Sequence, residues 1–213
     1  MKLLILGAGG HGKVVSEIAL LMKKWDDIYF LDDNKVGQEI NGIKVIGTLD
    51  KIKELRKEFT HAFVSIGDNM KRVEWFKYLE EMNYEIPVLI HPSSIISNNV
   101  KINKGTVIMP GSIINTNTVI GKACIINTNA SIDHDCQIGD GVHISPGVTI
   151  GGSVNIGDNT WVCIGATIIN NINIGKNCII AAGSTVIRDV PDNVMIAGVP
   201  GEIKKIIKLN ETR

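Results

Sequence analysis

The sequence is short of aromatic residues, of net charge and of long apolar runs. Only 5% of its 213 residues are Phe, Trp or Tyr, which leaves the packing to aliphatic side chains. The 22 basic residues balance the 22 acidic ones, so no overall field favours nucleic acid or an anionic membrane surface. No run reaches the roughly 18 apolar residues that a membrane-spanning helix needs, and the N-terminus lacks a signal-peptide pattern. We therefore expect a cytoplasmic globular protein that neither binds nucleic acid nor inserts into a membrane.

Cysteines are few and are not arranged for metal binding. The chain has four of them and no CxxC pair, and a reducing compartment keeps such cysteines as thiols. Cys124, Cys136 and Cys178 share one position of the repeat described next. We expect buried small side chains there, with neither a metal site nor a cysteine nucleophile.

An aliphatic residue recurs at every sixth position from 96 to 186, with no break in register. A second position, four residues later, is mostly small. This period is typical of a parallel β-helix, in which three hexapeptides close one 18-residue coil, and it predicts about five coils. The residue after each aliphatic one is often Gly, Asn or Asp, so we expect the tight turns and positive φ angles there. Ile172 is large for its position and predicts an irregular coil.

Residues 1–86 lack this period and alternate instead between strand and helix patterns. Apolar strands are expected at 3–6, 28–31 and 62–66, and amphipathic helices follow the first and third of these. Such alternation predicts a Rossmann-like βαβ domain with a parallel sheet. Two prolines in residues 87–93 suit a joint between domains. We therefore expect an α/β domain over 1–86 and the β-helix domain over 87–213.

A glycine-rich loop follows the first expected strand. Gly7, Gly9 and Gly12 satisfy G-x-G-x-x-G, and Asp32 ends the next strand. Such glycines let a phosphate approach the N-terminus of a helix, while the carboxylate accepts hydrogen bonds from ribose hydroxyls. A module of this size fits a mononucleotide or nucleotide-sugar better than a dinucleotide. The alternative interpretation is a tight turn beside solvated aspartates.

One of the five histidines stands out by its neighbours. His134 lies between Asp133 and Asp135, two residues after an inward isoleucine, and flanking carboxylates can orient an imidazole and raise its basicity. It is a candidate general base, although a surface histidine on a solenoid wall explains the same residues. His61 and His91 are interpreted as structural.

These features together resemble the hexapeptide-repeat sugar O- and N-acetyltransferases of the sialic acid O-acetyltransferase type. Within that family the chain is most similar to the bacterial nucleotide-aminosugar N-acetyltransferases of the bacillosamine and perosamine kind. The resemblance covers nearly the whole chain and depends on GAGGHG at 7–12, FLDD at 30–33, SIGDN at 65–69, LIHPSSIIS at 89–97, NTNASIDHDCQIGDGVHISPG at 127–147 and AGVPGEIKK at 197–205.

The resemblance implies roles for individual residues. His134 corresponds to the general base and Asp135 to the acid that tunes it. The set matching the nucleotide-sugar site is Gly9, Gly10, His11, Asp32, Asp33 and Gly67. The set matching the acetyl-CoA site is His143, Ile164 and Ala182. It also implies a left-handed β-helix, a homotrimer, acetyl-CoA as cosubstrate with no metal, and a place in cell-surface polysaccharide biosynthesis.

We therefore expect an acetyl-CoA-dependent N-acetyltransferase acting directly on a UDP- or GDP-linked 4-amino sugar. O-acetylation of a sialic acid or other sugar hydroxyl, and a non-catalytic scaffold that binds a nucleotide-sugar, are the alternatives. The donor to the oxyanion is expected to be the backbone N–H of a turn glycine such as Gly152 or Gly165. His134 and His143 are nine residues apart, half a coil, so they should point to different sides of one prism. If both serve one reaction, the site lies in a cleft between prisms of a trimer.

Overall fold

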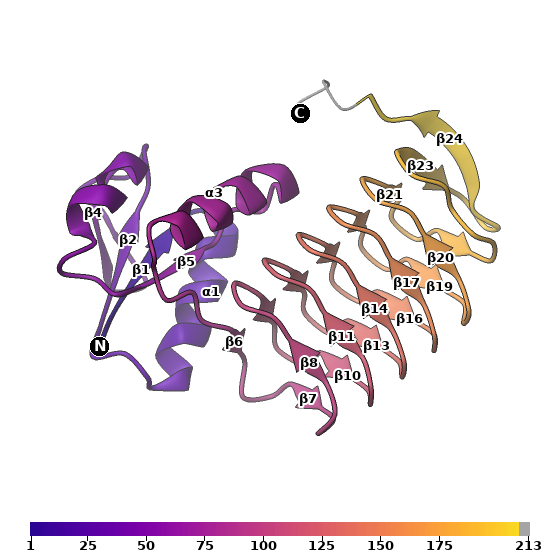
Figure 1. Ribbon diagram of the computed structural model, residues 1–213, viewed down its shortest axis with the longest axis horizontal. Coiled ribbons are helices and arrows are strands. Elements are labelled where there is room, and N and C mark those ends of the chain that lie inside the picture. The colour runs from indigo at the N-terminus through magenta and orange to yellow at the C-terminus, as the bar shows by residue number, and fades with distance from the viewer. Residues whose placement is uncertain (209–213) are drawn as a thin grey trace. The chain divides into compact units, whose positions relative to one another are not determined.

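The protein is described by a computed structural model over residues 1–208, in which two compact units are distinguished (Figure 1). The division lies between Pro92 and Ser93, at the end of the segment with the two prolines. Among residues 1–208, none of the helices combines the length and the hydropathy that a membrane span requires.

The first unit is built on a sheet of order β3-β4-β2-β1-β5. Strands β1 (Lys2–Leu6), β2 (Asp27–Leu31), β4 (Ile43–Gly47) and β5 (His61–Val64) are parallel, and β3 (Glu39–Ile40) pairs antiparallel with β4. Helix α1 (Gly10–Met22) follows β1, and α3 (Asn69–Glu81) follows β5. The expected βαβ alternation is therefore confirmed.

The segment from β3 to the short helices η1 (Leu49–Lys51) and α2 (Ile52–Leu55) was not expected from the sequence. In β4, buried and exposed residues alternate, which is the period of a half-buried strand. The five residues of β4 were too few for that signal to stand out. Strand β6 (Leu89–Ile90) closes the unit.

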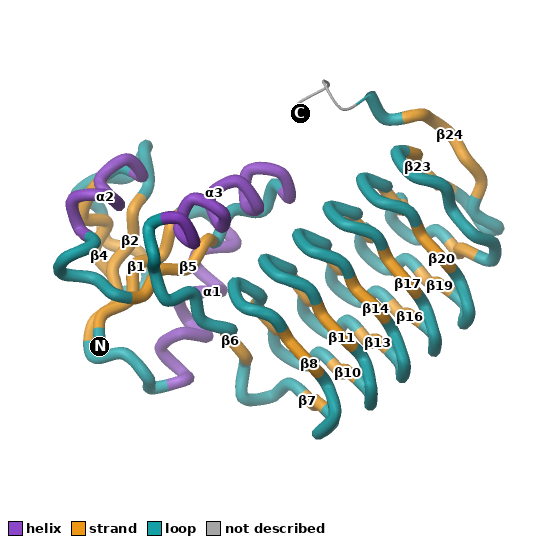
Figure 2. Tube along the Cα trace, viewed as in Figure 1, coloured by secondary structure: helices purple, strands orange, loops and turns teal. Residues whose placement is uncertain are grey.

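The second unit is a parallel β-helix with one two-residue strand per hexapeptide, joined by turns (Figure 2). The strands are β7 (Ile95–Ile96), β8 (Lys101–Ile102), β9 (Val107–Ile108), β10 (Ile113–Ile114), β11 (Val119–Ile120), β12 (Ile125–Ile126), β13 (Ser131–Ile132), β14 (Gln137–Ile138), β15 (His143–Ile144), β16 (Thr149–Ile150), β17 (Asn155–Ile156), β18 (Trp161–Val162), β19 (Thr167–Ile168), β20 (Asn173–Ile174), β21 (Ile179–Ile180) and β22 (Thr185–Val186). Strands β23 (Val194–Ala197) and β24 (Glu202–Ile206) end the described chain.

Every third strand joins the same sheet. One sheet has the order β22-β19-β16-β13-β10-β7, a second β20-β17-β14-β11-β8, and the third runs from β9 through β12, β15, β18 and β21 to β23 and β24. Residues 18 apart are paired in register, as Ile126 with Ile144 and Ile144 with Val162. The six-residue period is thus confirmed as a β-helix, and its handedness stays a prediction.

The core is made of the two inward columns that the period predicts. From Ile108 to Val186 every sixth residue is buried, and so are the small residues four positions later. The prediction of an irregular coil at Ile172 is wrong. The strands before and after it, β19 and β20, pair in register with β16 and β17 of the preceding coil, and the Ile172 side chain is buried. Close packing along these columns holds the turns that follow the strands.

The turns differ from expectation in one respect. From Ile102 to Ile180, positive φ falls three residues after each aliphatic residue, as at Asn129 (55°), Asp135 (58°) and Gly141 (68°), and not on the residue directly after it. The glycines directly after it are needed for space. A Cβ on Gly121 would lie 2.6 Å from the backbone of Gly139 in the next coil, and one on Gly157 2.6 Å from that of Lys176.

Candidate active site

The candidate base His134 lies in the turn that follows β13. Its neighbour Asp135 takes the left-handed conformation, which short polar side chains tolerate. This turn directs both side chains outward, and each is about half exposed (52% and 50%).

His134 and Asp135 form a directed pair. His134 Nδ1 lies 2.7 Å from Asp135 Oδ2, and the Asn117 amide donates to the other carboxylate oxygen at 3.1 Å. The hydrogen bond from His134, followed by that from Asn117, lowers the pKa of Asp135. The ionised carboxylate only accepts, so His134 Nδ1 carries the proton and donates. Nε2 of His134 is therefore the atom that can take a proton from a substrate.

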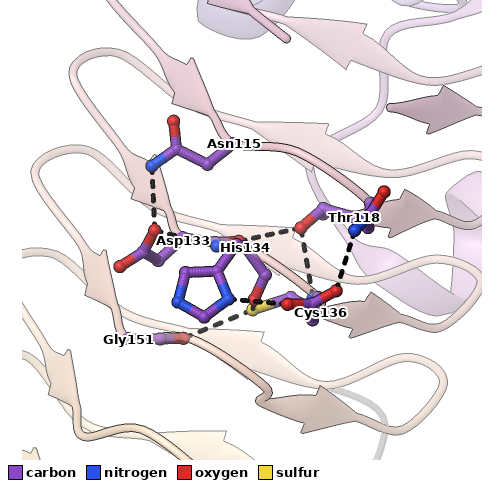
Figure 3. A network of polar contacts seen from close by, with 8 residues as sticks. Asn115, Thr118, Asp133, His134, Cys136 and Gly151 are labelled. Atoms are coloured by element: carbon purple, nitrogen blue, oxygen red, sulfur yellow. Dashed lines mark hydrogen bonds and ion pairs between the residues drawn. The ribbon is translucent and has the colours of Figure 1, made fainter. Parts of the chain in front are cut away.

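Asp133 adds charge beside the same ring. One of its oxygens accepts from the Asn115 amide at 2.9 Å and from the His134 backbone N–H at 2.8 Å (Figure 3). The pKa of His134 is raised, first by its hydrogen bond to Asp135 and then by the charge of Asp133. Both effects favour the imidazolium, which makes the ring a stronger base.

A depression of about 500 Å³ opens beside this turn. Its lining includes His134, Gly151, Gly152, Ile168, Ile169 and Asn170. The imidazole of His134 thus borders a space large enough for a small reacting group, with both polar and apolar groups around it.

His143 is held in a different network on β15. Asn127 Oδ1 accepts from the Thr128 N–H at 2.8 Å, so its amide NH₂ faces His143 Nε2 at 3.1 Å and donates to it. The proton of a neutral His143 is therefore on Nδ1. The Trp161 ring stacks on the imidazole at 6.0 Å between centroids, with 13° between the planes.

The three residues expected to bind acetyl-CoA lie on strands of one sheet or in the turns directly after them. Ile164 (63% exposed) follows β18, and Ala182, also exposed, follows β21, the two strands after β15 in that sheet. The turn of His134 follows β13 in another sheet. The expectation that His134 and His143 point to different sides of one prism is therefore confirmed.

The glycine loop of the first unit is tightly built. Gly9 is the N-cap of α1, with no side-chain cap, and Gly10 and His11 form the first helical turn. A Cβ on Gly12 would lie 2.2 Å from the Gly7 carbonyl oxygen, whereas Gly9 and Gly10 face open space. Backbone can therefore approach a ligand at Gly9 and Gly10.

Both aspartates after β2 have backbone partners. Asp32 accepts from the N–H groups of Ala8 (2.8 Å) and Asn34 (3.0 Å), and Asp33 accepts from the N–H of Leu49 (2.9 Å). They brace the loop, and each carboxylate keeps further lone pairs for a ligand. Gly67 follows β5 and has open space above its Cα.

His11 is neutral in this setting. Burial, and then the nearby charge of Arg72, lowers the pKa of His11 to about 3. Its Nε2 is buried and has no hydrogen-bond partner among the described residues. A neutral imidazole with an unused polar atom fits a ligand contact in the loop.

The sequence analysis missed two basic residues of this site. Lys35 Nζ donates to the Ala8 carbonyl oxygen at 2.6 Å, and its place two residues after Asp33 was an available signal. Arg72 is 1% exposed and donates to the carbonyl oxygens of Ile66 (3.1 Å) and Gly67 (3.0 Å). An arginine in an amphipathic helix is typical of an exposed face, so nothing in the sequence marked Arg72.

The cysteines are placed as expected. Cys124, Cys136 and Cys178 are buried thiols, and Cys163 is a half-buried one. Burial raises the pKa of the Cys136 and Cys178 thiols. Neither is an activated nucleophile.

Comparison with known proteins covers both units. The family described as the PglD N-terminal domain matches residues 2–79, and the bacterial transferase hexapeptide family (six repeats) matches residues 117–152 and 153–188. A curated relative, UDP-N-acetylbacillosamine N-acetyltransferase of Bacillus subtilis (strain 168), is 39% identical over 107 residues. That match spans 49% of this chain and 50% of the relative, so the chain matches about half the relative's length.

Solved structures match over nearly the full chain. A histidine variant of perosamine N-acetyltransferase from Caulobacter crescentus, in complex with CoA and GDP-perosamine, is 33% identical, with a TM-score of 0.93 over 96% of this chain and 97% of that one. The acetyltransferase domain of PglB from Neisseria gonorrhoeae, in complex with acetyl coenzyme A, is 34% identical, with a TM-score of 0.90 over 95% and 98%. The chain therefore belongs to the hexapeptide-repeat acetyltransferases with a PglD N-terminal domain, the family of the bacillosamine and perosamine N-acetyltransferases.

Proposed function

We propose that this chain transfers the acetyl group of acetyl-CoA to the amine of a nucleotide-linked aminosugar, with His134 as general base. The observation that carries the proposal is the likeness over nearly the whole chain to an N-acetyltransferase in complex with CoA and GDP-perosamine. The His134–Asp135 pair supports it independently, because a proton acceptor faces an open depression.

The reaction needs one base and no covalent enzyme intermediate. The sugar amine attacks the thioester carbonyl carbon, and a C–N bond forms as the carbonyl oxygen becomes an oxyanion. Nε2 of His134 takes the proton that the amine loses. The C–S bond then breaks, and the imidazolium returns its proton to the departing sulfur, giving CoA as a thiol. Asp135 orients the ring and stabilises its charged form throughout.

The backbone N–H of Gly152 is the better oxyanion donor of the two glycines considered. The Gly165 N–H already donates to the Pro146 carbonyl oxygen at 3.1 Å. Within the described residues, the Gly152 N–H makes no hydrogen bond, and it lines the depression beside His134. An unused donor next to the base suits the charge that develops on the carbonyl oxygen.

We assign acetyl-CoA to the surface of His143, Ile164 and Ala182, and we infer a homotrimer. His134 follows a strand of one sheet and His143 lies on a strand of another, so one small acyl group reaches both only if each comes from a different chain. Ile95 and Ile164 are large, exposed apolar side chains on the β-helix (65% and 63%), which supports burial against further copies. Cyclic association would give equivalent clefts.

The nucleotide-sugar is assigned to Gly9, Gly10, His11, Asp32, Asp33 and Gly67. Open space over Gly9 and Gly10 at the start of α1 supports a phosphate there.

The four cysteines are thiols, which is consistent with a reducing compartment. We therefore place the reaction in the cytoplasm, as a step of cell-surface polysaccharide synthesis.

Thiol release from acetyl-CoA tests the function. A panel of UDP- and GDP-linked 4-amino sugars is compared with sugars carrying a hydroxyl at the same carbon. We expect release with at least one amino sugar, and about 10²-fold or greater loss of turnover in folded His134→Ala protein. Release only with hydroxyl acceptors would contradict the proposal, as would near wild-type turnover by the variant.

Subunit mixing tests the shared cleft. His134→Ala and His143→Ala chains, each inactive, are mixed and allowed to exchange. Partial recovery of turnover is expected, because some clefts then receive both intact histidines. No recovery after demonstrated exchange would place both residues in a single chain's site.

A further inference from the structure

Gly152 lies one coil after His134, at the same position of the turn. A Cβ built on Gly152 would lie 2.7 Å from both Cε1 and Nε2 of His134 and 3.2 Å from Cδ2. These three atoms, all from the imidazole, are the nearest to that Cβ. The reactive edge of the ring therefore occupies the space that a side chain at 152 would take.

The ring is directed into this space by the groups on its other edge. Asp135 accepts from Nδ1 at 2.7 Å, and Asn117 fixes Asp135 at 3.1 Å. With Nδ1 held in this way, Nε2 can lie over residue 152 only if that residue has no side chain.

Neighbouring glycines serve the fold in a way that Gly152 does not. A Cβ on Gly151 would lie 2.7 Å from the backbone nitrogen of Asn170, which cannot move without disturbing the next coil. The φ angle of Gly152 lies outside the left-handed range, so an alanine there meets no backbone strain. Only the imidazole requires glycine at this position.

We infer that Gly152 is a positioning residue for His134, whose missing side chain leaves room for Nε2 while Asp135 orients the ring. The role of His134 as a base rests on the proposed function, whereas the close approach of its ring to Gly152 does not. The inference assigns Gly152 a steric role, separate from any use of its N–H as a donor.

A methyl group at 152 would move the base. Ordinary contact begins at 3.4 Å, so Cε1 and Nε2 must shift by about 0.7 Å from their present 2.7 Å. The shift lengthens the contact of Nδ1 with Asp135 and moves Nε2 from its place beside the depression. A misplacement on the order of 1 Å can cost about 10²-fold in rate.

The experiment combines kinetics with NMR titration of the imidazole in full-length protein. Gly152→Ala is compared with wild type, and the His134 signal is assigned by its absence in His134→Ala. We expect kcat to fall by about 10²-fold, with little change in KM for the nucleotide-sugar. We also expect the pKa of His134 to fall towards its ordinary value as the Asp135 contact weakens, while the charge of Asp133 stays in place.

The matched control is Gly152→Ala in the His134→Ala background. With the imidazole gone, the methyl should leave the melting temperature unchanged, because its nearest neighbours are then absent. If Gly152→Ala alone fails to fold while the double variant folds, the clash with the imidazole is shown directly.

Three results would overturn the inference: an unchanged His134 titration, an unchanged kcat in an active enzyme, or a double variant that melts at a lower temperature than His134→Ala alone or does not fold. If wild type acetylates no aminosugar, the proposed function fails, but the titration still decides whether Gly152 positions the ring.

Discussion

Replacing Asp135 by Asn should leave the turn intact and give His134 the wrong tautomer. Asn tolerates the φ of 58° at this position. Asp135 now accepts from two donors, His134 Nδ1 and the Asn117 amide, one on each oxygen. An asparagine has only one oxygen, so if it accepts from Asn117, its NH₂ group faces Nδ1 of His134. Nδ1 must then accept, the proton moves to Nε2, and Nε2 can no longer take a proton from the amine.

The size of the effect follows from exposure. At a buried serine-protease triad, the same Asp to Asn change costs about 10⁴ in kcat through the wrong tautomer. Here the carboxylate is 50% exposed, so water competes and lets the ring sample its productive form. We therefore expect a loss on the order of 10² in kcat.

The pH dependence of kcat/KM tests the role of Asp135 independently of the loss in kcat. The hydrogen bond to Asp135 is the largest cause of the raised pKa of His134, so removing the charge lowers that pKa. Because the base works when unprotonated, the acid limb of kcat/KM should move to lower pH. Steady-state thiol release from about pH 5 to 9 measures both effects.

Asp133→Asn is the matched control. Its remaining oxygen can still accept from both Asn115 and the His134 N–H, so it removes charge without changing the tautomer. We expect a small shift of the acid limb and little loss of kcat. An Asp135→Asn enzyme with wild-type kcat and an unmoved acid limb would refute the paired-base account.

Three further changes test other parts of the structure. Asp32→Ala should raise KM for the nucleotide-sugar far more than KM for acetyl-CoA in steady-state assays, since its carboxylate lies at the glycine loop; equal rises would mean that it only braces the loop. Cys136→Ala should keep turnover within about threefold, because burial raises the thiol pKa and keeps it protonated at neutral pH; a loss of a hundredfold would reopen covalent catalysis. Ile144→Ala should lower the free energy of unfolding by about 2–5 kcal/mol in urea titration at fixed protein concentration, because its side chain is fully buried; a loss under about 1 kcal/mol would mean loose packing of the column.

The fold of the second unit could be predicted because its information is local and repeated. One aliphatic residue per hexapeptide sets every strand, and an error at one position such as Ile172 cannot shift the register of the others. The prediction placed the positive φ angles wrongly because turn-forming residue types occur at two positions of each hexapeptide, directly after the aliphatic residue and three residues after it. Gly121 is there for space and Asn129 for its conformation, and composition alone does not separate these causes.

The site could be predicted in part for similar reasons. His134 and Asp135 are adjacent in sequence, so their pairing needed only local chemistry, whereas the 2.7 Å contact between Nδ1 and Oδ2 needed coordinates. Gly152 lies one 18-residue coil after His134, so the period already placed them together. That the ring leans over Gly152 depends on the contact with Asp135. Arg72 could not be foreseen because its acceptors are carbonyl groups of a loop before the helix.

Identification of the acetylated atom tests the central claim most directly. Purified protein is incubated with acetyl-CoA and a UDP- or GDP-linked 4-amino sugar, and the product is analysed by mass spectrometry and NMR, with His134→Ala as control. The account predicts one added acetyl group on the sugar nitrogen, as an amide that resists hydroxylamine, formed at a rate that depends on His134. An acetyl ester on a sugar hydroxyl, or no transfer although both substrates bind, would contradict it.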